Sequence, residues 1–146
     1  MGQLDAGQKI ALDTNLFIYL VEKNPNYFST AKLLFDKIQK GQLIGITSSL
    51  IYTEVLSNPL KKGNTAIADK YNVLLATFPN LIVKNVDKDI AIISARLRAK
   101  YNIKTPDAIF IATGIAENAD TFITNDSQLK KIEEIKITLL NQINNN

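Results

Sequence analysis

The chain has 146 residues, of which 46% are hydrophobic and 21% are charged, a balance typical of one globular domain with a real core. It contains no Cys and no His, which excludes disulfides, thiolate metal sites, His-ligated zinc and catalysis by a His base. A metal site in this chain must therefore be built from oxygen ligands, which favours Mg²⁺, Mn²⁺ or Ca²⁺.

The formal net charge of +3 indicates an anionic partner only weakly, because a small excess of Lys is common in proteins that bind no nucleic acid. No apolar run reaches the length of a membrane span. The first residues also lack the basic start and apolar core of a signal peptide. Together with the absence of Cys, these features predict a cytoplasmic protein with no membrane partner.

Short apolar strands alternate with helices along the chain. We expect strands at about residues 9–12, 43–47, 81–86, 121–124 and 135–140, and helices at about residues 15–22, 28–40, 49–57, 65–77, 88–101 and 106–118. Asn58-Pro59 should end the third helix, and Thr105 should cap the last helix with Pro106 as its first residue. This alternation predicts an α/β fold with a central parallel sheet of about five strands and helices on both faces.

The sequence shows no internal repeat and no linker, so we expect a single domain. Its limits are predicted at residues 8–140, with a flexible leader at residues 1–7 and a disordered tail at residues 141–146. In a parallel sheet of this kind, ligands bind beyond the carboxyl ends of the strands.

Four acidic residues stand alone in otherwise uncharged stretches, whereas most other acids lie within a residue or two of another charge. The four are Asp13, Glu54, Asp107 and Asp126. Asp13 and Asp126 each follow a predicted strand, which places them at the carboxyl edge of the sheet. Glu54 lies at the edge of the apolar stripe of its predicted helix, and Asp107 lies on the core-facing side of its own.

Each acid also has a local interpretation to be weighed. Asp13 could be a helix cap, Asp107 could favour the helix dipole and Asp126 could be a turn residue, whereas Glu54 has no such simple alternative. Taken together, several carboxylates at one edge would repel one another and raise their own pKa values. A divalent cation reverses that penalty, and such a site can hold a scissile phosphate and activate a water molecule.

The segments around the four acids resemble the motifs of PIN domains, in the same order and over nearly the whole chain. These segments are Asp13-Thr14-Asn15, Thr53-Glu54-Val55-Leu56, Thr105-Pro106-Asp107-Ala108 and Phe122-Ile123-Thr124-Asn125-Asp126. The leader before the first strand departs from the pattern, since it is longer than is usual in the compact toxins that contain a PIN domain.

The resemblance implies a divalent-metal-dependent endoribonuclease that hydrolyses RNA phosphodiester bonds, most often the toxin of a VapC-type toxin–antitoxin pair. It also implies a five-stranded parallel sheet, a homodimer and a cognate antitoxin as partner. Asp13, Asp107 and Asp126 would hold one or two Mg²⁺ or Mn²⁺ ions, and Glu54 would bind a metal or orient the attacking water. Thr14, Asn15 and Thr124 would support the carboxylates or a phosphate oxygen, or else only cap the local backbone.

A basic run precedes the helix of Asp107. It consists of Arg96, Arg98, Lys100 and Lys104, with no acid among them. These side chains could guide an RNA backbone toward the acids, or they could form an ordinary solvated helix face.

Two other functions stay open at this point. The chain could be a catalytically inactive PIN-like module that binds RNA or a protein. It could also be a phosphoaspartate protein with Asp13 as the nucleophile, although Asp13-Thr14-Asn15 lacks the second acid that aspartyl phosphatases place two residues later.

Overall fold

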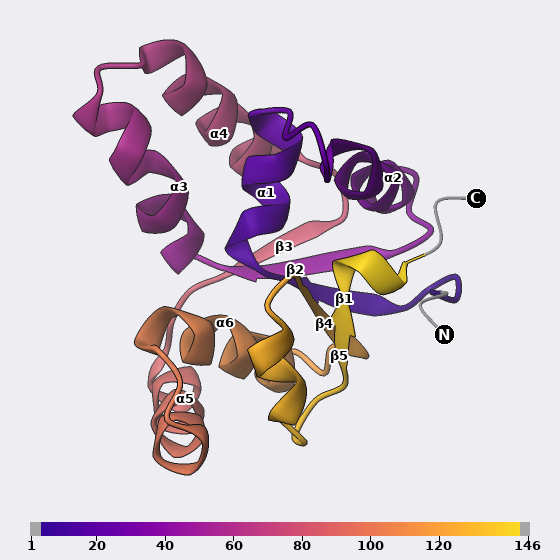
Figure 1. Ribbon diagram of the computed structural model, residues 1–146, viewed down its shortest axis with the longest axis vertical. Helices are drawn as coiled ribbons and strands as arrows, with labels where there is room; N and C mark the ends of the chain where they lie inside the picture. Colours follow the sequence, from indigo (N-terminus) through magenta and orange to yellow (C-terminus); the bar gives the residue numbers. More distant parts are fainter. Residues whose placement is uncertain (1–3, 144–146) are drawn as a thin grey trace.

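Parallel strands form the centre of the molecule in the order β3-β2-β1-β4-β5 (Figure 1). The structure is a computed structural model, and it describes residues 4–143. The strands are β1 (Lys9–Leu12), β2 (Ile44–Ser48), β3 (Leu81–Lys84), β4 (Thr121–Thr124) and β5 (Ile137–Leu139). All neighbouring strands run parallel, which confirms the predicted α/β fold.

Helices cover both faces of this sheet, as Figure 1 shows. One face carries α1 (Thr14–Val21), α2 (Phe28–Gln39), α3 (Leu50–Lys61) and α4 (Thr65–Thr77), and the other carries α5 (Lys88–Tyr101) and α6 (Thr105–Ala116). Two short 3₁₀ helices, η1 (Ser127–Lys131) and η2 (Leu140–Gln142), flank β5. The helices α3 and α4 form a hairpin that extends away from the sheet.

The central strand β1 ends next to β4 at the carboxyl edge of the sheet. Ile10, Ala11 and Leu12 are all buried because helices pack on both sides of the sheet. Leu12 pairs with Ile123 of β4, and the backbone N–H of Asp13 donates to the carbonyl of Ile123 at 3.0 Å. The strands β1 and β4 therefore end side by side, and the residues that follow them meet at one edge.

Close packing of α6 on β1 brings a third segment to this edge. A Cβ atom at Gly114 of α6 would lie only 2.8 Å from the Cβ atom of Ala11 in β1. Gly114 therefore lets the helix approach the strand more closely than any other residue would allow. The first turn of α6, which contains Asp107, reaches the carboxyl edge as a result.

The third helix differs from the sequence prediction. It continues through Pro59 to Lys61, whereas the Asn58-Pro59 pair was expected to end it. A proline in a helix interior removes one hydrogen bond and costs about 3 kcal/mol. Pro59 is buried near the end of α3, so its packing offsets a loss that affects only the last turns of the helix.

Smaller differences concern the ends of other elements. The helix α6 begins at Thr105 rather than after it, and its N-cap is Lys104, whose side chain makes no capping hydrogen bond. The strand β3 ends earlier than expected because its partner β2 ends at Ser48, opposite Lys84. The strand β5 is shorter than expected at both ends and pairs with β4 only from Ile137 to Leu139. None of the helices within residues 4–143 is long and apolar enough to cross a membrane.

The segments at both ends of the described chain pack against the domain. The N–H of Gly7 donates to the carbonyl of Gln42 at 2.8 Å, and Leu4 contacts the hydrophobic core. Ile143 is only 9% exposed. The division into a leader (1–7), a domain (8–140) and a tail (141–146) stays a prediction, and its outermost residues lie outside the described range.

We expect Gly114→Ala to lower the free energy of unfolding by about 1–2 kcal/mol. The new methyl group would have to push α6 away from β1, and this strain should exceed the gain of about 0.5–1 kcal/mol that Ala has over Gly in a helix. Urea denaturation would measure the change. An unchanged or higher stability would show that α6 can move away from β1 without loss.

Candidate active site

A cleft of about 370 Å³ opens at the carboxyl edge of the sheet, between the start of α1, the middle of α3 and the start of α6. The side chains that line it are Asp13, Thr14, Asn15, Ile18, Glu54, Lys104, Pro106, Asp107, Phe110 and Asp126. The fold thus brings together the four acids that stand apart in the sequence. Their roles in catalysis or metal binding stay predictions.

Asp13 is the most buried of the four acids, with 7% of its surface exposed. The hydroxyl of Thr124 donates to its Oδ2 at 2.6 Å, and the N–H of Thr14 donates to its Oδ1 at 2.8 Å. Burial raises the pKa of the Asp13 carboxyl, the two hydrogen bonds oppose this rise, and the nearby charge of Asp126 adds to it. Asp13 is also the N-cap of α1, so its local role and its place in the cleft coexist.

Asp107 lies in the first turn of α6 and is half-buried. Burial and the charges of Asp13 and Asp126 raise the pKa of its carboxyl from 3.8 to about 6. Lys104 opposes this rise, and the charge of Glu54 makes the smallest contribution to it. Within residues 4–143, no Lys or Arg forms an ion pair with any of the four acids. The cleft therefore concentrates negative charge that Lys104, the one basic side chain lining it, offsets only in part.

Asp126 and Asp13 are linked through one threonine. Asp126 is exposed and caps η1 by accepting a hydrogen bond from the N–H of Gln128 at 3.0 Å. Its own N–H donates to the hydroxyl oxygen of Thr124 at 3.1 Å, and the same hydroxyl donates to Asp13. Thr124 is fully buried, so it holds both acidic segments in a fixed relation.

Glu54 occupies a different environment from the other acids. It lies on α3 and is exposed, although it was expected at the edge of the buried stripe of its helix. Its neighbours on that stripe, Ile51 and Val55, are buried as their spacing indicates. Glu54 thus lines the cleft while its side chain stays exposed to solvent.

Of the three other polar candidates, Thr14 and Asn15 line the cleft and Thr124 does not. Thr14 lines the cleft, and its hydroxyl is buried with no hydrogen-bond partner among the described residues. Asn15 lines the cleft but is exposed. Thr124 touches the site only through its hydrogen bonds to the two aspartates.

The donor set fits a hard divalent cation in its chemistry, because carboxylate oxygens are the ligands that Mg²⁺ and Mn²⁺ prefer. As the side chains stand, however, no three acidic residues in the described part of the chain are close enough to hold one ion. A metal held directly by three of the four carboxylates would require some of them to move closer together, whereas a metal held by one or two carboxylates and water would not.

The predicted basic run does not form one surface. Lys104 lines the cleft, but Arg98 donates from Nε to the carbonyl of Ile103 at 3.1 Å. Lys100 donates to Glu134 at 3.2 Å and lies over the ring of Tyr101. Arg96 is exposed on α5. Of the four basic residues, only Lys104 is in a position to meet a ligand in the acidic cleft.

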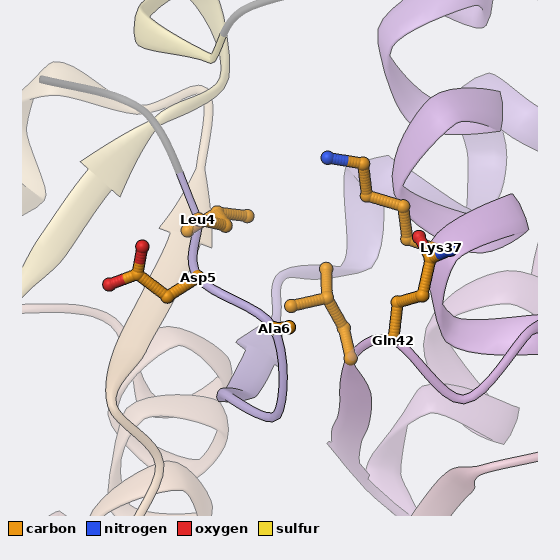
Figure 2. Close-up of a pocket in the computed structure, with 6 residues that line it drawn as sticks. Leu4, Asp5, Ala6, Lys37 and Gln42 are labelled. Atoms are coloured by element: carbon orange, nitrogen blue, oxygen red, sulfur yellow. The ribbon is translucent and has the colours of Figure 1, made fainter.

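A second hollow, of about 260 Å³, lies near the amino ends of the strands (Figure 2). It is formed by the segment Leu4-Asp5-Ala6 on one side and by Lys37, Gln42 and Leu43 on the other. In Figure 2 the carboxylate of Asp5 points away from Lys37. This hollow has no group of acids and is not a candidate for the same chemistry.

Sequence reasoning missed two kinds of residue at the site. The apolar walls Ile18 and Phe110 follow Thr14 and Asp107 by one helical turn, so helical spacing could have indicated them. The contact between the side-chain amide of Asn125 and the hydroxyl of Tyr19, at 3.2 Å, joins segments far apart in the chain. No local pattern could have revealed that contact.

The fold and the cleft define an α/β protein with a carboxylate-rich site at the edge of a five-stranded parallel sheet. The family model described as the PIN domain matches residues 10–135, and the chain belongs to this family. No protein of curated function matches the sequence.

Several solved structures share the fold. A chain of the VapBC2 complex from Rickettsia felis, bound to a promoter DNA fragment, is 22% identical with a TM-score of 0.70, and the match covers 90% of this chain and 98% of that one. A toxin–antitoxin complex from Klebsiella pneumoniae is 23% identical, with a TM-score of 0.65 and coverage of 88% and 95%. VapC20 of Mycobacterium tuberculosis, a toxin that cleaves the sarcin-ricin loop, is 14% identical, with a TM-score of 0.69 and coverage of 88% and 99%. At these identities the likeness establishes the fold alone.

We expect Asp107→Asn to stabilise the metal-free protein at pH 7 by about 1–2 kcal/mol. The pKa of Asp107 rises from 3.8 to about 6 on folding, so the native state binds more protons between these values and stability falls as the pH rises through them. The full change would correspond to about 3 kcal/mol, and solvent near this half-buried group reduces it. Urea denaturation in EDTA from pH 4 to pH 7 should show the two proteins converging at low pH. A constant difference across this range would contradict the assignment.

Proposed function

We propose that the chain is a divalent-metal-dependent endoribonuclease that hydrolyses RNA phosphodiester bonds and acts as the toxin of a toxin–antitoxin pair. The observation that carries this proposal is the convergence of Asp13, Glu54, Asp107 and Asp126 in one cleft without an ion-paired cation. Membership of the PIN domain family supports it, as does the similarity of the fold to proteins of toxin–antitoxin complexes.

One or two Mg²⁺ or Mn²⁺ ions would be held by Asp13, Asp107 and Asp126, directly or through water, with Glu54 as a further ligand or as the group that orients the attacking water. When bound, such an ion would polarise the phosphate and lower the pKa of a water molecule. It would also relieve the mutual repulsion that raises the pKa of Asp107.

The protein's own contribution would be orientation. The hydrogen bonds from Thr124 and Thr14 fix the plane of the Asp13 carboxylate, so this ligand is held in place before substrate arrives. Lys104 would attract the RNA backbone into a cleft that otherwise repels phosphate. The mechanism needs no protein nucleophile.

A second candidate function is a non-catalytic PIN-like module that binds RNA or a protein. It is favoured by one observation, since no three acids among residues 4–143 are close enough to hold an ion as they stand. Calorimetric titration with Mn²⁺ near neutral pH separates the two candidates. The nuclease should bind the ion with a stoichiometry of one or two, and the module should bind none.

The partners follow from the same proposal. Complexes of toxin and antitoxin among the structural neighbours support a cognate antitoxin as partner of this chain in the cytoplasm. A homodimer is also proposed. Light scattering of the purified chain, alone and after co-expression with the product of the adjacent reading frame, would measure both associations.

We expect Asp13→Asn and Asp107→Asn each to reduce RNA cleavage in Mn²⁺ by at least about 100-fold, because each removes a charged oxygen ligand. Cleavage of a structured RNA by the wild-type chain should also cease in EDTA. The assay is gel analysis of end-labelled RNA. Asp69→Asn, a change at an exposed acid on α4 outside the cleft, is the matched control and should cleave at the wild-type rate.

Wild-type cleavage rates in the Asp13→Asn and Asp107→Asn proteins would mean that the observed activity comes from a contaminating nuclease or another site. Full activity in EDTA would contradict the metal dependence while leaving the cleft as a possible binding site. Calorimetry on the same variants would then report whether the acids bind Mn²⁺.

A further inference from the structure

Glu54 lies on a different kind of structural element from the other three acids of the cleft. Asp13 and Asp126 follow the paired strands β1 and β4, and Asp107 lies on α6, which packs on the sheet. Glu54 lies instead on the α3–α4 hairpin, which extends away from the sheet in Figure 1. Its distance from the other acids therefore depends on how this hairpin is held, both at its base by β2 and α6 and along its length by α1.

A buried tyrosine holds the hairpin to the neighbouring helix. Tyr71, in the middle of α4, is fully buried, and its hydroxyl donates a hydrogen bond to Oε2 of Glu22. Glu22 is the C-cap residue of α1, the helix whose N-cap is Asp13. This one contact joins the hairpin that bears Glu54 to the helix that begins at the most buried acid of the cleft.

The hydrogen bond supplies what the apolar contacts between these helices lack. The hydrophobic effect is non-directional, whereas a hydrogen bond requires a narrow range of distances and angles. Burial and the neighbouring Glu22 raise the pKa of Tyr71, so its hydroxyl keeps the proton that it donates. The bond thus fixes the position of α4 along α1, and α3 follows because it packs on both helices.

We propose that Tyr71 and Glu22 are positioning residues that set the place of Glu54 in the acidic cleft through the α3–α4 hairpin. The catalytic part of this inference rests on the proposed ribonuclease function. A displacement of about 1 Å at a reacting group can cost 10²-fold in rate, so even a small shift of α3 should be measurable.

The first test is a double-mutant cycle in the RNA cleavage assay with Mn²⁺. Tyr71→Phe should lower kcat about 10-fold with little change in KM, since Glu54 would be misplaced while RNA binding is kept. In a Glu54→Gln background the same change should have an effect below about 2-fold, because the group to be positioned is already lost. Equal effects in both backgrounds would overturn the proposal, and so would no effect in either.

The chain offers a matched control for this substitution. Tyr101, on α5, also donates from its hydroxyl to a glutamate, Glu134, at 2.6 Å. Tyr101→Phe removes the same kind of bond on the opposite face of the sheet from the hairpin (Figure 1). Tyr101→Phe should change kcat by the same factor in the wild-type background and in the Glu54→Gln background. A coupling to Glu54 as large as that of Tyr71 would overturn the proposal.

Changes at the acceptor test the same bond without altering the core, because Glu22 is exposed. Glu22→Ala removes the acceptor and should lower kcat as Tyr71→Phe does. Glu22→Gln keeps an oxygen that can accept from Tyr71 and should restore most of the rate. If Gln is as damaging as Ala, the bond is not the cause of the effect.

A measurement that needs no activity separates this inference from the proposed function. The chain has no Cys, so spin labels attach only at introduced positions. With labels at Asn58→Cys on α3 and Gln128→Cys on η1, pulsed electron spin resonance should show a distance distribution that Tyr71→Phe shifts or broadens and Tyr101→Phe does not. An unchanged distribution would overturn the positioning role. A shifted distribution in a chain that cleaves no RNA would support that role and refute the nuclease.

Discussion

The burial of the Asp13 carboxylate between the ends of β1 and β4 is the constraint on which the rest of the site depends. A charged group in such a place requires hydrogen bonds or a counter-charge. Thr124 and Thr14 supply the hydrogen bonds, but no basic side chain among the described residues supplies the charge. The pKa of Asp13 is raised mainly by this burial, the charge of Asp126 adds to the rise, and the two hydrogen bonds oppose it.

The parallel sheet explains why the other acids also lie close to uncompensated negative charge. Parallel strands end at a common edge, and β1 and β4 place Asp13 and Asp126 there directly. Gly114 lets α6 approach β1, so Asp107 arrives at the same edge from the opposite face. Each step is favourable for packing and unfavourable for electrostatics. The repulsion that results is the physical reason for expecting a divalent ion at this edge in addition to the local capping roles of Asp13 and Asp126.

The sequence is sufficient to predict most of the fold, because strands and helices alternate with clear caps and the four acids lie in uncharged stretches. It is insufficient where long-range packing overrides a local signal. Pro59 continues α3 because its ring is buried, and a run of basic residues is divided because Arg98 and Lys100 find partners that lie elsewhere in the fold. The exposure of Glu54 could not be predicted either, since periodicity indicates the face of a helix but not how far that helix stands from its neighbours.

The four acids of the site are held in two different ways. Asp13, Asp107 and Asp126 are held by strand pairing, by close helix packing and by the hydroxyl of Thr124. Glu54 lies on α3, which packs on α1, α4 and α6, and the hydrogen bond from Tyr71 to Glu22 adds a directional contact between α4 and α1. Because no three acids in the described part of the chain are close enough to hold one ion, direct binding of an ion by three carboxylates would require some of them to move closer together. If metal binding draws the carboxylates together, the position of α3 sets how far Glu54 has to move.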